Sequence, residues 1–190
     1  GDHVVLHWRP SSGIQAPTAT YQWKGKRVNA GWVTTFNEKA VISENRLTVI
    51  PKNFDLRIAA LFGCAITSGF GAVNNDANVK IGQSVLIFGI GGMGLSIAYA
   101  SSLVSAYPII GIDIHKSKIN MGKKFGLTHS VDGNSKNLKS KIEKILGEKG
   151  PEVVFETTGK AKLMEKAFEI TPNDGKTIFV GVPDNKIKIY

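Results

Sequence analysis

A glycine-rich loop between an apolar run and a helical segment is the feature that most limits how this chain can fold. The apolar run Val85–Phe88 leads directly into G-x-G-x-x-G, which spans residues 89–94 and includes Gly92 as a fourth glycine. In such a strand–loop–helix unit Gly89 permits the sharp turn, Gly91 permits close approach of a phosphate, and Gly94 permits tight helix–strand packing. The motif alone is a weak signal, because many tight strand-to-helix turns contain the same glycines.

A second apolar run ends in an acidic residue, and this supports the interpretation of the glycine loop as part of a nucleotide site. Ile109–Asp113 places a carboxylate 19 residues after Gly94, close to the spacing of about 20 at which such an acid binds the adenosine ribose hydroxyls of NAD. The same charge would repel the additional phosphate of NADP. A helix-capping role for Asp113 is the alternative, and the spacing favours the ribose. We therefore expect a dinucleotide site, with NAD as the cofactor.

The rest of the second half alternates apolar strands with helical segments, which predicts an α/β fold with a doubly wound parallel sheet of the Rossmann type. Glycines follow two of the helices at Gly126 and Gly147, where a left-handed C-cap favours glycine. The expected strands are residues 84–88, 109–113, 129–131, 153–157 and 177–182. The expected helices are residues 92–105, 116–125, 136–146 and 161–170.

The first 50 residues have a different texture, rich in β-branched and aromatic residues, and predict short antiparallel strands. No helix is expected before Pro51; residues 56–62 are helical in composition and lead into a glycine-rich stretch at residues 64–71. The expected strands are residues 4–8, 19–23, 32–36, 39–43 and 47–50.

The net charge of +9 raises nucleic acid as a partner, but its distribution argues against one. Residues 1–65 hold 8 basic and 4 acidic side chains and residues 66–190 hold 16 and 11, so the charge divides into +4 and +5. A nucleic-acid site is normally one dense basic face. The densest lysines, at positions 136–144, alternate with apolar residues as on a solvated helix face. We expect no nucleic-acid partner.

Neither a membrane span nor a disulfide framework is expected. No apolar run approaches the roughly 18–20 residues that cross a bilayer, and the first residues lack the pattern of a signal peptide. The sequence begins with Gly1 and not with an initiator Met, so we expect the chain to be a fragment of a longer protein. Cys64 is the only cysteine, which excludes an internal disulfide and a four-cysteine zinc site. These features point to a cytoplasmic protein without a membrane partner.

Several segments together resemble the zinc-dependent medium-chain alcohol dehydrogenases, the class that includes glutathione-dependent formaldehyde dehydrogenase. The resembling segments are residues 63–73, 89–94, 111–118, 153–159 and 179–183. The resemblance implies that residues 1–65 are part of a GroES-like catalytic domain. It implies that residues 66–190 are the NAD-binding Rossmann domain, without its last strand.

The resemblance also assigns site residues. It makes Cys64 a ligand of the catalytic zinc, and Lys118 the lysine that reaches the adenosine ribose. It places Ser68 near the nicotinamide, where the family more often has Thr, and Met93 behind the nicotinamide ring. The remaining candidate cofactor contacts are at the carboxyl ends of strands, where open α/β sheets bind ligands: Thr158, Val180 and Val182.

The chain also departs from the family pattern. The family's first two zinc ligands and its proton-relay hydroxyl precede the segment that Gly1 matches, and residues 11–14 stand where the family has a cysteine-rich structural zinc lobe. We therefore expect no catalytic residue in this chain, an incomplete zinc site, and no activity from the chain alone. The longer enzyme is expected to be a homodimer that oxidises a small alcohol to an aldehyde. Residues 187–190 alternate as an edge strand does and are expected to pair its subunits.

Three other readings stay open. A zinc-independent NADP-linked reductase of the same superfamily is disfavoured by Cys64 and Asp113. A methyltransferase is disfavoured by the β-rich first 50 residues and by the sequence at residues 181–183. A non-catalytic Rossmann binding module is the more serious rival, because a fold does not confer activity.

Overall fold

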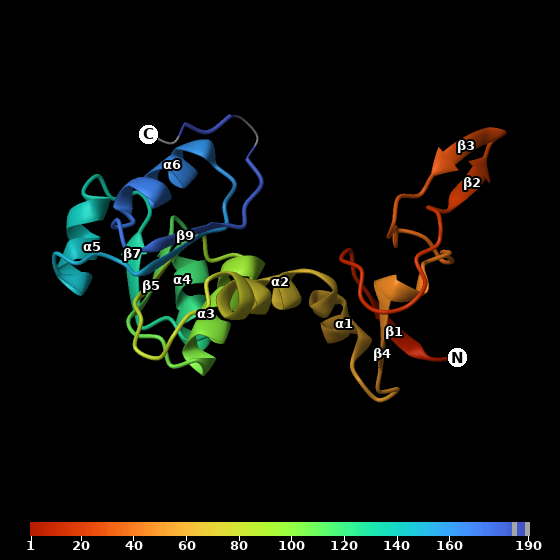
Figure 1. Ribbon diagram of the computed structural model, residues 1–190, viewed down its shortest axis with the longest axis horizontal. Coiled ribbons are helices and arrows are strands. Elements are labelled where there is room, and N and C mark those ends of the chain that lie inside the picture. The colour runs from red at the N-terminus through yellow and green to blue at the C-terminus, as the bar shows by residue number, and fades with distance from the viewer. Residues whose placement is uncertain (184–185, 189–190) are drawn as a thin grey trace. The chain divides into compact units, whose positions relative to one another are not determined.

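The computed structural model describes residues 1–183 and 186–188. The chain divides into two compact units, Gly1–Thr67 and Ser68–Tyr190. Figure 1 shows the helices and strands of both units, with labels on most of them.

The second unit is built on a five-stranded parallel sheet in the order β7-β6-β5-β8-β9. The strands are β5 (Val85–Phe88), β6 (Ile109–Asp113), β7 (His129–Asp132), β8 (Val153–Glu156) and β9 (Lys176–Phe179). The chain proceeds from β5 outward through β6 and β7, then returns to the other side of β5 with β8 and β9. The strand order therefore reverses between β5 and β8, and ligands of open α/β sheets bind at the carboxyl ends beside such a switch point.

Helices cover both faces of this sheet, so the predicted doubly wound fold is confirmed. The helices are α3 (Gly92–Leu103), α4 (Lys116–Lys124), α5 (Leu138–Leu146) and α6 (Ala161–Ile170). Val85 and Ile87 of β5 belong to the core that includes Ile97 of α3, whereas Leu86 and Phe88 belong to the core that includes Ile142 of α5. This alternation, within a strand that is buried at every position, is what a sheet covered on both faces requires.

The ends of these elements follow local rules. Gly126 and Gly147 both have positive φ, +98° and +73°, as expected for glycines that terminate helices. Strand β9 ends at Phe179 and not at residue 182, because the N–H groups of Val180 and Gly181 both donate to the Glu156 carbonyl oxygen. The described residues 186–188 contain no strand, and the rest of the expected pairing segment, Ile189 and Tyr190, lies outside the described residues.

The first unit contains two antiparallel pairs of strands. Strand β1 (His3–Leu6) pairs with β4 (Leu47–Ile50), and β2 (Thr20–Trp23) pairs with β3 (Lys26–Asn29). The β2–β3 turn has positive φ at Lys24 and Gly25, the geometry that suits a two-residue hairpin loop.

The predicted strands at residues 32–36 and 39–43 are wrong: the described residues 30–43 contain no strand, and a 3₁₀ turn, η1 (Glu44–Arg46), follows them. The Arg46 guanidinium lies 4.8 Å from the Trp32 ring centroid and 5.7 Å from that of Trp8. Trp32 is therefore used for a cation–π contact, although its β propensity is typical of a strand.

Short helical segments lie in the sequence between β4 and β5, the first strand of the parallel sheet. They are α1 (Leu56–Ala59), the 3₁₀ turn η2 (Ala60–Gly63), α2 (Ala65–Gly71) and the π turn η3 (Ala72–Asp76). A Cβ on Gly69 of α2 would lie 2.5 Å from the Ser96 Cβ, so glycine permits this helix to pack closely on α3. Among the described residues no single helix is long and apolar enough to cross a membrane; Leu56–Gly63 with Ala65–Asp76, a bent pair, would qualify by length and composition.

Candidate cofactor-binding site

The glycine loop adopts the geometry that its sequence requires. Gly89 follows β5 with φ +87°, and a Cβ there would lie 2.7 Å from Thr158 Cγ2. A Cβ on Gly94 would overlap the Gly89 carbonyl oxygen, so only glycine permits this approach of α3 to the loop. At Gly91, the N-cap of α3, no described atom lies within 4 Å of an added Cβ. The loop is thus tightly packed at its two ends and open at Gly91.

The Asp113 carboxylate is fixed beside this loop by backbone groups. Its side chain is 6% exposed. Oδ2 accepts from the Ile90 N–H at 2.9 Å and Oδ1 accepts from the His115 N–H at 2.8 Å. The Lys118 Nζ lies 3.9 Å from Oδ2. Because an ionised carboxylate has about four acceptor positions, about two remain for hydroxyl groups of a ligand.

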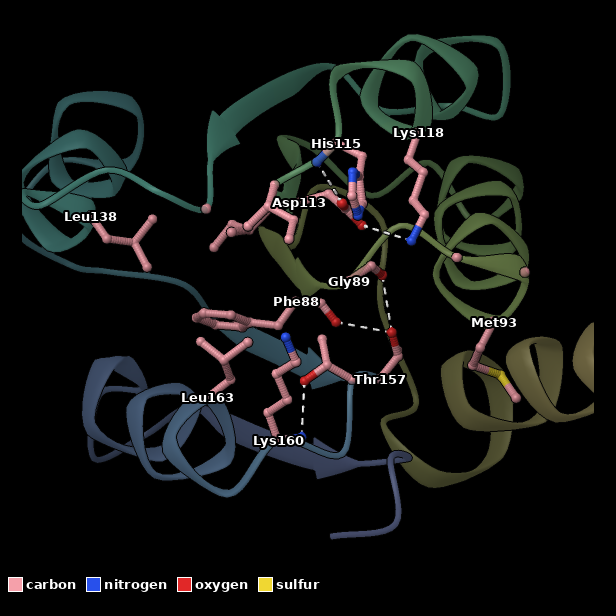
Figure 2. A pocket seen from close by; sticks show the side chains of 16 residues that line it. Phe88, Gly89, Met93, Asp113, His115, Lys118, Leu138, Thr157, Lys160 and Leu163 are labelled. Atoms are coloured by element: carbon pink, nitrogen blue, oxygen red, sulfur yellow. Dashed lines mark hydrogen bonds and ion pairs between the residues drawn. The ribbon is translucent and has the colours of Figure 1, made fainter. Parts of the chain in front are cut away.

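These groups line a cavity of about 360 Å³ at the carboxyl ends of β5, β6 and β8 (Figure 2). Seven of the sequence-predicted cofactor residues are among its lining: Gly89, Gly91, Gly92, Met93, Asp113, Lys118 and Thr158. Thr157 lines the cavity next to the glycine loop, where its hydroxyl donates to the carbonyl oxygens of Phe88 and Gly89 at 2.9 and 3.0 Å.

The cavity combines an apolar end with charged groups. Leu138 and Leu163 lie with Phe88 at one end in Figure 2, and Met93 lies at the other. The Lys160 side chain extends into the cavity toward Phe88 (Figure 2). Free N–H groups at the start of α3 and nearby lysines favour an anion. The arrangement suits a ligand with an apolar ring, a diol and phosphates.

Sequence reasoning missed Leu138, Lys160 and Leu163 as lining residues. A signal for them exists: each lies at or beside the start of the helix that follows β7 or β8. Because parallel strands present their carboxyl ends at one edge, the first turns of the following helices surround the same ligand site.

The other predicted residues lie elsewhere. Gly94 is packed behind the loop, and within the described ranges 1–183 and 186–188 Ser68, Val180 and Val182 are not part of the cavity lining. Cys64 is exposed and belongs to the first unit.

The donor set of this chain does not fit a catalytic zinc. No cluster of three or more His, Cys, Asp or Glu side chains occurs among the described residues. His7 is already engaged, with Nδ1 2.7 Å from the Arg9 carbonyl oxygen and Nε2 3.0 Å from Thr48 Oγ1. Catalytic zinc in proteins has three protein ligands, and Cys64 supplies one thiolate.

We therefore expect that the chain retains no stoichiometric zinc. Elemental analysis after incubation with zinc and gel filtration should give far less than one equivalent, both for the chain and for Cys64→Ser. The variant tests residues 10–31 in particular, since they contain neither Cys nor His. One full equivalent in Cys64→Ser would show a zinc site that the donor set does not explain.

Comparison with known proteins identifies the family of this chain. The family model described as "Zinc-binding dehydrogenase" matches residues 89–190, which is more than half of the chain. The chain belongs to the zinc-binding dehydrogenase family. The resemblance to zinc-dependent alcohol dehydrogenases is thereby confirmed.

Individual relatives of this zinc-binding dehydrogenase chain are similar over most of it. Alcohol dehydrogenase-like 2 of Arabidopsis thaliana is 36% identical over 162 residues, covering 83% of the chain and 42% of that protein. S-(hydroxymethyl)glutathione dehydrogenase of Paracoccus denitrificans is 32% identical over 158 residues, covering 78% and 42%. The chain thus spans about two fifths of the length of these relatives.

Solved structures show the same fold. Benzyl alcohol dehydrogenase from Acinetobacter calcoaceticus matches with a TM-score of 0.73 and 25% identity, covering 78% of the chain and 41% of that structure. A zinc-binding domain protein of the alcohol dehydrogenase type from Burkholderia ambifaria matches with a TM-score of 0.73 and 28% identity, covering 78% and 40%.

Proposed function

We propose that this chain is the NAD-binding part of a zinc-type alcohol dehydrogenase. The observation that carries the proposal is the Asp113 carboxylate, held by the backbone of the glycine loop at the wall of a cavity that suits a dinucleotide. In the longer enzyme, NAD accepts a hydride from a small alcohol, and the product is the aldehyde.

Within this proposal each part of the cavity has one role. The apolar end at Leu138 and Leu163 takes the adenine ring, and Asp113 with Lys118 binds the adenosine ribose. The open position at Gly91 and the start of α3 bind the pyrophosphate.

The nicotinamide half extends toward Met93 and Thr158. Ser68, Val180 and Val182 are proposed to complete its site. Cys64 and the first unit are proposed to belong to the GroES-like catalytic domain and its zinc site. The enzyme is proposed to be cytoplasmic and homodimeric.

Two other functions remain as rivals. A zinc-independent NADP-linked reductase would need a group for the 2′-phosphate, and the site offers a buried carboxylate there, while residues 68–190 contain no arginine. A non-catalytic binding module would bind the cofactor without hydride transfer. A measurement of cofactor preference distinguishes the NADP-linked reductase from the proposed NAD-linked enzyme.

We expect the chain to bind NAD more tightly than NADP. The Asp113 charge opposes the 2′-phosphate, and the two nearby lysines, Lys118 and Lys160, offset this repulsion only in part. Titration calorimetry with each oxidised cofactor, at one salt concentration, measures the preference. NADP affinity equal to or above that of NAD would favour the reductase, and no binding of either would contradict the proposal as a whole.

A further inference from the structure

A fully buried carboxylate, Glu156, ends strand β8 next to the cavity. Its exposed fraction is 0%, and within residues 1–183 and 186–188 it forms no salt bridge. Burying a charged group is unfavourable unless hydrogen bonds replace the lost water. The position of this group therefore calls for a physical reason.

Three donors satisfy the carboxylate, and both oxygens are used. Oε1 accepts from the Thr158 N–H at 2.8 Å and from the Thr158 hydroxyl. Oε2 accepts from the Gly159 N–H at 3.2 Å. An amide in this place has a single acceptor oxygen, so glutamine would turn an N–H donor toward one of these three donors.

The same residue joins a second loop to the first. The Glu156 carbonyl oxygen accepts from the N–H groups of Val180 and Gly181 at 2.8 and 3.0 Å. A Cβ on Gly181 would overlap the Gly159 nitrogen and would lie 2.8 Å from Glu156 Oε2. Residues 157–160 and 180–182 therefore meet at Glu156 without spare room.

The hydrogen bonds continue from Glu156 to the cavity wall. The Thr158 hydroxyl, which donates to Glu156, accepts from the Lys160 N–H at 3.1 Å, drawn as a dashed line in Figure 2. Thr158 and Lys160 both line the cavity, and Lys160 is the N-cap of α6. Chains of hydrogen bonds of this kind polarise and strengthen one another.

We infer that Glu156 is a positioning residue for the nicotinamide half of the site, acting through the Thr158 side chain and residues 180–182. The inference rests on the proposed function. Asp113, which serves the adenosine half, lies on β6, on the other side of β5 from β8. The two halves of the cofactor are thus held by separate carboxylates.

The test compares two ligands in Glu156→Gln. NADH carries the nicotinamide and ADP-ribose does not, so the variant should weaken NADH binding by about ten-fold or more and change ADP-ribose binding by less than about two-fold. Titration calorimetry measures both affinities in the full chain. Retained ADP-ribose binding also shows that the variant is folded.

Glu152→Gln is the matched control, because it makes the same substitution just before β8, at the other end of this strand. Glu152 Oε2 accepts from the Ser84 N–H and hydroxyl at 2.8 and 3.2 Å, and neither residue is in the cavity lining. Both ligands should bind to this variant as they bind to the unsubstituted chain.

Thr158 variants test the inference independently and decide it if Glu156→Gln does not fold. Thr158→Val removes the hydroxyl that donates to Glu156 and should weaken NADH binding several-fold. Thr158→Ser keeps the hydroxyl and should weaken NADH binding clearly less than Thr158→Val. In Glu156→Gln/Thr158→Val the two effects should not add, since both break one network.

Three results would overturn the inference. They are unchanged NADH binding in Glu156→Gln, equal loss of both ligands in that variant with unchanged circular dichroism at 222 nm, or additive effects in the double variant. An unsubstituted chain that binds neither ligand would instead contradict the proposed function.

Discussion

Asp113→Asn is expected to weaken NAD binding by about 10- to 100-fold. A hydrogen bond to a charged group is worth about 1.5–3 kcal/mol, and about 1.4 kcal/mol corresponds to a factor of ten. The substitution removes the charged group that is proposed to accept from the ribose hydroxyls. It also turns an amide N–H toward the N–H of Ile90 or of His115, so the glycine loop loses part of its support. NADP binding should fall less, because the repulsion of its 2′-phosphate is removed at the same time.

Asp132→Asn is the control for this experiment. Asp132 pairs with Asp113 across the sheet, at the carboxyl end of β7, and its Oδ1 accepts from the Asn134 N–H at 2.9 Å. It is not a lining residue of the cavity among the residues that the structure describes. Calorimetry should therefore find NAD affinity unchanged in Asp132→Asn. A fall of similar size in both variants would mean that the loss of affinity is not specific to the Asp113 contact.

Gly94→Ala is expected to destabilise the second unit by about 2–4 kcal/mol, because its Cβ would overlap the Gly89 carbonyl oxygen, which is a backbone atom and not the end of a flexible side chain. Gly91→Ala should leave stability within about 0.5 kcal/mol, since its Cβ meets no described atom within 4 Å and its φ of −83° suits alanine. The same methyl group projects into the space proposed for the pyrophosphate and should sharply weaken NAD binding. Gly94→Ala should thus change stability, whereas Gly91→Ala in the same loop should change cofactor binding.

Urea unfolding measures this contrast with two probes. Circular dichroism at 222 nm follows the helices, most of which are in the second unit. The three tryptophans, Trp8, Trp23 and Trp32, are all in the first unit, so their fluorescence reports on that unit separately. Gly94→Ala should shift the first signal and leave the second in place. A Gly94→Ala variant as stable as the unsubstituted chain, or normal NAD affinity in Gly91→Ala, would contradict the assigned roles.

The centre of the sheet in the second unit could be predicted from sequence because the strands β5, β6 and β8 are continuous buried runs. Val85–Phe88 is buried at all four positions, and such a run between glycine signals has few alternatives. In the first unit the same reasoning located β1, β2 and β4 but failed at residues 32–36 and 39–43. Residues 32–36 carry strand-forming side chains, but strand formation needs a partner, and the Trp32 ring packs on Arg46 instead.

The site was predictable to the extent that it is local in sequence. The glycine loop and Asp113 are recognisable by spacing, and they line the cavity. Glu156 could not be predicted in this way. Thr158 is a candidate because it lies at the end of a predicted strand, whereas the role inferred for Glu156 depends on its complete burial and on the contact between two loops. Neither property is visible in the sequence of one strand.

The fixed position of Asp113 has a consequence for binding kinetics. Two backbone N–H groups hold its carboxylate in place before any ligand arrives. A pre-positioned acceptor loses little conformational entropy when the ribose binds, so association needs no rearrangement of this side chain. NAD and NADP should therefore associate at similar rates, and the preference between them should appear in how long each cofactor stays bound.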